Sequence, residues 1–198
     1  AATKDGDRSA ARASDAAGDD SALRVLLVLT NQGTLGDRDE PTGLFLSEAS
    51  HPWHVFDEAG FEVVLASPDG GPAPIDPRSL QLDDPENAAF VERFAEDGRV
   101  TETVSLARVD PGAFDAVFFA GGHGTMWDFP TVPAVRTVAE GVHRRGGVLA
   151  AVCHGPAALV PLRDADGRPL VAGRRVTGFT NAEEDAVELT EAMPFLLE

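Results

Sequence analysis

Cysteine and lysine are nearly absent from this chain. Cys153 is the only cysteine and Lys4 the only lysine among 198 residues. A single cysteine excludes an internal disulfide, and no cluster of cysteine and histidine has the spacing of a structural zinc site. These absences are typical of a protein from a reducing compartment, so we expect a cytoplasmic protein.

Long apolar runs are also absent. No run reaches the roughly 18 apolar residues that a membrane-spanning helix needs. The N-terminal residues contain no apolar core of the kind found in secretory signals. We therefore expect neither a membrane span nor export by the usual secretory route.

Positive charge is scarce as well. The chain carries 33 acidic against 16 basic residues, a formal net charge of -17. Such a surface repels the phosphates of nucleic acids and anionic lipids. Nucleic acid and membrane surfaces are therefore not expected as partners.

The chain divides into a short tail and one domain. Residues 1–22 are small or charged, show no periodicity and include no large apolar residue. They cannot offset the entropy lost on ordering, so we expect a disordered N-terminal tail. Residues 23–198 have a length that suits one domain with its own core.

Within residues 23–198, apolar runs of strand length alternate with helical patterns. This alternation predicts an α/β fold with an open, mostly parallel sheet and helices on both faces. We expect a loop over 68–80, and over 163–179 a hairpin around Asp166 and Gly167 that leads into a further strand. Strands are expected at 24–30, 61–67, 114–122 and 147–153, and helices at 44–60, 84–98, 134–146, 155–162 and 181–198.

The stretch AAVCHG, residues 150–155, runs from an apolar strand directly into Cys153, His154 and Gly155. This order resembles a nucleophile elbow, in which a tight turn presents a reactive side chain above a sheet. A following helix is expected to lower the pKa of the thiol, and the histidine could move a proton. The alternative is a buried structural cysteine, a common fate of this residue type.

Two other stretches carry groups of chemical interest. The glycines of GGHG, residues 121–124, follow a strand and could expose backbone N–H groups to an oxyanion, although a tight turn is the commoner reason for such a pair of glycines. Glu48, His51 and His54 share one helical face, and Glu48 could act as a general base. Their order lacks the HExxH pattern and Pro52 interrupts them, so we expect no metal there.

Four ordered blocks together carry a family resemblance. They are TGLFLSEASHPWHVFDEAGFEV, DAVFFAGGHGTMWDFP, GGVLAAVCHGPAAL and GRPLVAGRRVTGFTNAEE. In these blocks the chain resembles the ThiJ/PfpI superfamily, which shares its flavodoxin-like fold with class I glutamine amidotransferases. Its glyoxalase III and stress-chaperone branch is the most similar. Relatives of this kind continue past MPFLLE with a further strand and helix, which are expected to be missing here.

The resemblance implies roles for particular residues. Cys153 matches the nucleophile, His154 the neighbouring histidine and Glu48 the carboxylate that contacts the thiol. The third member of the triad matches Glu184, although Glu183 beside it is an alternative. Gly122 and the backbone amide of His154 match the oxyanion hole. The walls of the substrate pocket are expected to include Gly121, His123, Trp127 and His51.

The resemblance also implies an activity. This branch converts methylglyoxal and related 2-oxoaldehydes into 2-hydroxy acids without glutathione, metal or other cofactor. We therefore expect a small aldehyde as the substrate, and a homodimer as the commonest assembly. The alternatives are a cysteine peptidase or amidase, a protein deglycase, and a stress-related holdase chaperone or redox sensor that uses an oxidisable cysteine.

Overall fold

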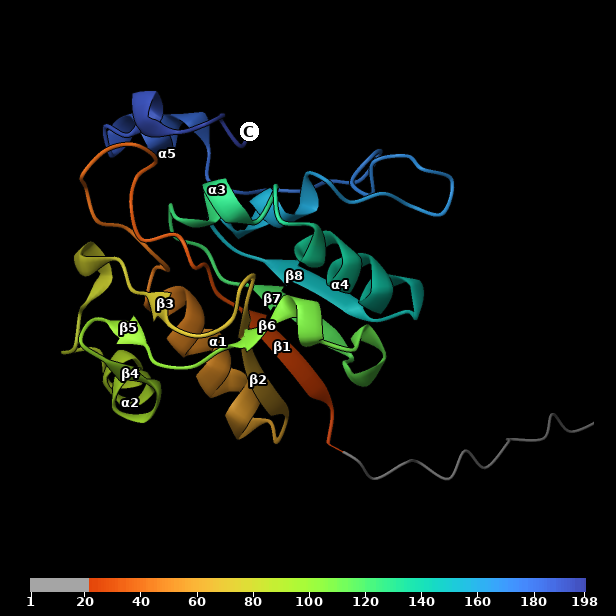
Figure 1. Ribbon diagram of the computed structural model, residues 1–198, viewed down its shortest axis with the longest axis horizontal. Helices are drawn as coiled ribbons and strands as arrows, with labels where there is room; N and C mark the ends of the chain where they lie inside the picture. Colours follow the sequence, from red (N-terminus) through yellow and green to blue (C-terminus); the bar gives the residue numbers. More distant parts are fainter. Residues whose placement is uncertain (1–21) are drawn as a thin grey trace, which may run out of the picture.

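The computed structural model describes residues 22–198, so nearly all of the expected tail lies outside the described residues. Its centre is a parallel sheet with the strand order β6-β2-β1-β7-β8 (Figure 1). All four pairings in this sheet are parallel, which confirms the predicted sheet type. The strands are β1 (Arg24–Val28), β2 (Glu62–Ser67), β6 (Val104–Ser105), β7 (Ala116–Phe119) and β8 (Val148–Ala151).

The strand order fixes where a site can form. Without the two-residue edge strand β6, the four longer strands lie in the order second, first, third, fourth, as in flavodoxin-like sheets. The direction of winding reverses between β1 and β7. Ligands of such sheets bind beyond the carboxyl ends of the strands at this reversal.

Helices cover both faces of the sheet. The side chains of β1 are apolar on both faces, so each face must be buried against another element. Leu26 and Val28 pack into one core, whereas Leu27 and Leu29 pack into another. The first core contains the predicted helical stripe of Val135, Val138, Ala139 and Val142, of which no member is more than 2% exposed. The helices are α3 (Thr125–Asp128) and α4 (Pro133–Arg144) on the first face, and α1 (Ser47–Glu58) and α2 (Pro85–Phe94) on the second (Figure 1).

A small antiparallel sheet was not predicted. The helix expected over 84–98 ends at Phe94, and the chain then turns back on itself at Asp97 and Gly98, both with positive φ. Two-residue strands have no hydrophobic period, so the pattern of the sequence does not reveal them. The strands are β3 (Ala73–Pro74), which lies in the expected loop 68–80, β4 (Ala95–Glu96) and β5 (Arg99–Val100), in the order β3-β5-β4.

The C-terminal quarter also differs from expectation. The hairpin expected within 163–179 is a single bridge between Arg163 and Pro169, and no strand follows it. Residues 172–177 are exposed and do not join the sheet. The helix expected over 181–198 is only α5 (Asn181–Ala186), because Glu188 adopts a φ of 60° that ends the helical path. A 3-10 turn, η5 (Thr190–Ala192), comes next.

No helix in residues 22–198 is both long and apolar enough to cross a membrane.

Candidate active site

Cys153 occupies a sharp turn directly beyond β8. Its φ of 57° lies in the left-handed region, which costs a non-glycine residue roughly 1–3 kcal/mol. Neighbouring backbone bonds hold this conformation: the Phe179 amide donates to the Cys153 carbonyl at 2.8 Å, and the Gly155 amide to the Val152 carbonyl at 2.7 Å. The chain continues into a 3-10 helix, η4 (Gly155–Leu159). Strand, strained turn and short helix thus present the thiol at the end of the sheet.

Gly155 allows this turn to pack against β7. A Cβ at this position would collide with the carbonyl oxygen of Phe119, as expected for a glycine that admits neighbouring backbone. Backbone cannot move aside as a flexible side chain can. The close approach of η4 to β7 therefore depends on glycine.

Gly155→Ala is expected to lower the free energy of unfolding by roughly 1–3 kcal/mol, the usual cost of overpacking. Gly33→Ala is the matched control, because its Cβ would lie 3.4 Å from Pro74, an ordinary contact. Urea unfolding of both variants measures the difference. Equal stability of the two variants would contradict the close packing.

Two backbone N–H groups face the sulfur. The amides of Gly122 and His154 both donate towards Cys153 and favour its thiolate. Gly122 follows β7 and has a φ of 103°, a conformation that glycine adopts readily. The two N–H groups come from separate segments that meet beside β7 and β8, and this pair can stabilise an oxyanion.

Glu48 approaches the same sulfur from the first turn of α1. Its carboxyl group faces the Cys153 thiol and the Gly121 amide, and burial raises its pKa to about 7. Its Oε2 is buried without a hydrogen-bond partner in the described structure. A Cβ on Gly121 would collide with this oxygen, so the glycine makes room for the carboxyl group.

The pKa of Cys153 is raised, first by burial and then by the charge of Glu48. The expectation of a lowered pKa is therefore wrong. The following helix has only five 3-10 residues, and its dipole is too weak to offset the loss of solvent and a facing carboxylate. Glu48 and Cys153 share their protons as a pair. The pair loses one proton near pH 7, and the raised pKa of Cys153 means that the second proton is still bound at physiological pH.

His154 is fully buried beside the cysteine. Its Nδ1 lies 3.4 Å from Sγ of Cys153, and its Nε2 lies 2.8 Å from Oε2 of Glu184. Burial lowers the pKa of His154 to about 4, so the ring is neutral at physiological pH. The ring of Phe179 packs against it, with centroids 4.3 Å apart.

The two adjacent glutamates have different environments. Glu184 is 4% exposed and contacts His154, whereas Glu183 is exposed. The carboxylate of Glu183 accepts bonds from the amide and hydroxyl of Thr180 and so forms the capping box of α5. Of the two candidates, only Glu184 lies within hydrogen-bond distance of the histidine.

His123, expected only as a wall of the pocket, contacts Glu184. Its Nε2 lies 2.9 Å from Oε1 of Glu184, so one carboxylate contacts two histidines. The ring centroids of His123 and His154 are 4.2 Å apart. The resemblance placed His123 in the wall of the substrate pocket, but the 61 residues between His123 and Glu184 leave no spacing signal for their contact.

Two of the expected pocket residues lie elsewhere. His51 is directed towards the start of α2, where its Nε2 lies 2.8 Å from Asp84. The indole of Trp127 lies beside Gly36 and lines a shallow cavity with Arg38 and Pro194. Neither side chain joins the group around Cys153.

Within the described residues, His123, His154 and Glu184 are close enough to hold a metal ion. Their hydrogen bonds argue for a different use. Arg78 donates to Nδ1 of His123 at 3.3 Å, and a guanidinium has no acceptor. This nitrogen must accept, so the proton of the neutral ring stays on Nε2, the atom a metal would require. The group therefore fits a hydrogen-bonded chain better than a metal site.

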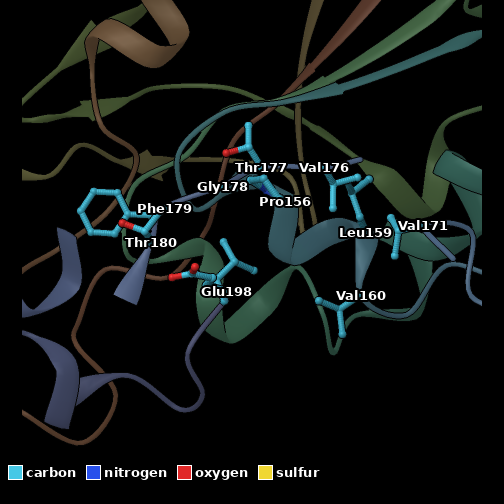
Figure 2. Close-up of a pocket in the computed structure, with 11 residues that line it drawn as sticks. Pro156, Leu159, Val160, Val171, Val176, Thr177, Gly178, Phe179, Thr180 and Glu198 are labelled. Atoms are coloured by element: carbon cyan, nitrogen blue, oxygen red, sulfur yellow. The ribbon is translucent and has the colours of Figure 1, made fainter. Parts of the chain in front are cut away.

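A mostly apolar cavity of about 290 Å³ has Phe179 among the residues that line it (Figure 2). Its lining comes from η4, from residues 176–180 and from the C-terminal residues of the chain. Cys153, Glu48 and the two histidines do not contribute to it. The chemistry is therefore centred on the turn beyond β8 and not in this cavity.

These features define a class: a flavodoxin-like α/β protein with a cysteine-centred site at the reversal of its sheet. The thiol, two inward-facing amides, a carboxyl group and an imidazole converge there from three strand ends. The model of the DJ-1/PfpI family matches residues 42–193, and the chain belongs to that family. The resemblance inferred from the four sequence blocks is thus confirmed.

Several relatives of this chain have names that contain the word glyoxalase. The chain is 36% identical over 178 residues to "Glyoxalase 3" of Candida albicans, covering 86% of this chain and 75% of the relative. It is 34% identical over 167 residues to "Glutathione-independent glyoxalase HSP31" of Saccharomyces cerevisiae, covering 81% and 70%. The crystal structure of glyoxalase III from C. albicans superposes with a TM-score of 0.76 at 35% identity, covering 85% and 73%.

Proposed function

We propose that the protein is a glutathione-independent glyoxalase that converts methylglyoxal and related 2-oxoaldehydes into 2-hydroxy acids such as lactate. This activity would class it as a lyase of the D-lactate dehydratase type. One observation carries the proposal: the Cys153 sulfur contacts a carboxyl group on one side and a neutral imidazole on the other. A proton shift between adjacent carbons needs such proton carriers around one nucleophile. Relatives named as glyoxalases support it.

The reaction begins at the aldehyde carbon, C1. The Cys153 thiolate adds to C1 while Glu48 holds the proton, and the new oxyanion is stabilised by the amides of Gly122 and His154. Protonation of the oxyanion gives a hemithioacetal. The buried carboxyl group of Glu48 can supply this proton and so neutralise the oxyanion.

A proton then leaves C1, and one is added at C2 through an enediol. Either Glu48 or His154 serves as the base. C1 is oxidised to a thioester and C2 is reduced to an alcohol, so the electrons stay within the substrate and no external oxidant, reductant or cofactor is required. Water finally cleaves the thioester, which releases the 2-hydroxy acid and restores the thiol. Glu184 orients His154 throughout.

The rate is expected to depend on two ionisations. kcat/KM should rise as the pH increases through about 7, because the pair of Glu48 and Cys153 must lose one proton before the thiolate can form. A second loss of activity is expected as the pH falls towards about 4, where His154 becomes protonated. Initial rates between pH 4 and pH 9 test this profile. A rate that is flat between pH 6 and pH 8 would contradict the first assignment.

The experiment that tests the function is turnover of methylglyoxal by the purified chain, without glutathione and with EDTA present. Catalytic formation of lactate supports the proposal. Hydrolysis of amides, release of sugar adducts from protein, or suppression of client aggregation without aldehyde turnover would instead favour a peptidase or amidase, a deglycase or a holdase. Glu48 argues against a peptidase, because a carboxyl group against the nucleophile crowds a peptide.

We further propose that the protein acts in the cytoplasm, as a homodimer, on a small aldehyde. The free, oxidisable thiol suits a reducing compartment. Light scattering coupled to gel filtration measures the assembly. A monomeric mass at the working concentration would contradict the dimer.

A further inference from the structure

The hydrogen bonds of the candidate site continue beyond the three residues of a triad. Both oxygens of Glu184 are in use, one with His154 and one with His123. The Nδ1 of His123 in turn faces Nη2 of Arg78 at 3.3 Å. This series of contacts, called here the hydrogen-bonded chain, runs from Arg78 through His123, Glu184 and His154 to Cys153.

Arg78 is held firmly although its side chain is 47% exposed. It donates from Nε and Nη2 to the two oxygens of Asp76, at 2.9 and 2.6 Å. Asp76 is 1% exposed and also accepts from the Thr42 hydroxyl at 3.0 Å. A planar guanidinium bound to both oxygens of a buried carboxylate keeps one orientation.

Arg78, at one end of the hydrogen-bonded chain, determines which ring nitrogen of each histidine carries the proton. A guanidinium only donates, so Nδ1 of His123 accepts and Nε2 carries the proton. That proton points at Glu184, which accepts from both histidines. His154 then also carries its proton on Nε2. Its Nδ1 is left with a free lone pair 3.4 Å from the sulfur.

We propose that Arg78 and His123 are positioning residues that fix the tautomer of His154 and hold it ready to accept a proton at Nδ1. The proposal deepens the proposed function, on which it rests for its substrate, but it applies to the thiol of Cys153 whatever the substrate. Neither residue touches the sulfur. Both act through Glu184.

The charges around His154 give the proposal a pH signature. His154 faces Glu183 and Glu184 of α5, His123 of the turn after β7, Arg78 and the coupled pair of Cys153 and Glu48. Arg78 is the permanent positive charge of this set, and it lowers the pKa of both histidines. Without it, His154 binds a proton at a higher pH. The fall in rate at acid pH should therefore begin at a higher pH.

The test compares a disruptive and a conservative variant at each position. Arg78→Gln removes the charge, whereas Arg78→Lys keeps a cation that only donates. His123→Phe removes both ring nitrogens, whereas His123→Gln retains a donor for Glu184 and an acceptor for Arg78. Arg108→Gln and His143→Phe are matched controls outside the hydrogen-bonded chain. Thermal unfolding confirms that each variant folds.

Two readouts are measured across pH: kcat/KM with methylglyoxal, and the rate at which iodoacetamide alkylates Cys153. We expect Arg78→Gln and His123→Phe to lose about 10- to 100-fold in kcat/KM, by analogy with residues that hydrogen-bond and orient the ligands of a metal site. The loss should fall mainly on kcat. The acid limb of both readouts should move to higher pH in Arg78→Gln. Arg78→Lys and His123→Gln should recover most of the wild-type rate.

Some results would overturn the proposal. A wild-type pH dependence of Arg78→Gln in both readouts would show that the charge of Arg78 does not act on His154. Equal losses in the disruptive and conservative variants would reduce both residues to a structural role. If the wild type fails to turn over methylglyoxal, the proposed function fails, and the alkylation profiles still decide this proposal.

Discussion

Cys153→Ala is expected to lower kcat/KM for methylglyoxal by at least about 10⁴-fold, as does loss of the nucleophile in other enzymes with a triad. Without the thiol no hemithioacetal forms, and the amides of Gly122 and His154 have no covalent oxyanion to stabilise. Cys153→Ser should be nearly as inactive, because a hydroxyl group in this buried position ionises far less readily than a thiol. Lactate formation by the three proteins, followed over time, measures the effect.

Folding must be separated from chemistry in this comparison. Cys153 adopts a strained φ that other backbone bonds hold, so both variants should retain the wild-type unfolding midpoint within a few degrees. Substantial turnover by a folded Cys153→Ala protein would exclude covalent catalysis by this thiol.

Glu48→Gln is expected to lower kcat/KM by about 10²- to 10⁴-fold, the usual contribution of a general acid or base. The amide keeps the shape of the carboxyl group but cannot exchange a proton with the sulfur or the substrate. Glu58→Gln is the matched control, because Glu58 is the last residue of the same helix and its exposed carboxyl group lies 3.4 Å from His54. Its activity should equal that of the wild type.

Although Glu48→Gln should lower activity, it should raise the free energy of unfolding at alkaline pH. Folding raises the pKa of Glu48 from 4.5 to about 7, so the folded state binds the extra proton. The resulting stabilisation is fully present below pH 4.5 and is lost as the pH rises through about 7. Glu48→Gln should therefore be more stable than the wild type at pH 8, by roughly 2–3 kcal/mol, and similar to it near pH 4. Equal stability at pH 8 would contradict the raised pKa.

The sheet was predictable from sequence because its strands are apolar on both faces. The runs at residues 24–30 and 147–153 are apolar and of strand length, and the glycines and polar residues after them favour strands. β1 is buried as this pattern suggests, whereas β8 lies at the edge of the sheet and is only partly buried. The stripe of α4 was equally clear. By contrast, β4 and β5 have two residues each and carry no period, and Glu188 ends α5 in a region whose composition still favours helix.

The site was predictable only in part, for a related physical reason. Local sequence indicates the turn at Cys153 and the glycines after β7, because these features depend on neighbouring residues. The pKa of Cys153 depends on burial and on Glu48, which is distant in sequence, and the local helix suggested the wrong direction. The contacts of Glu184 with His154 and His123 likewise arise from folding alone. The catalytic roles of these residues stay predictions until they are tested.

One measurement tests the central claim most directly. Methylglyoxal labelled with ¹³C at C1 is mixed with a catalytic amount of the wild-type protein, without glutathione and with EDTA, and its carbon is followed by NMR. We predict that the aldehyde signal is replaced by the carboxylate signal of lactate over many turnovers, and that Cys153→Ala leaves the aldehyde unchanged. Consumption that stops at about one equivalent, with the label remaining on the protein as adducts, would contradict a glyoxalase.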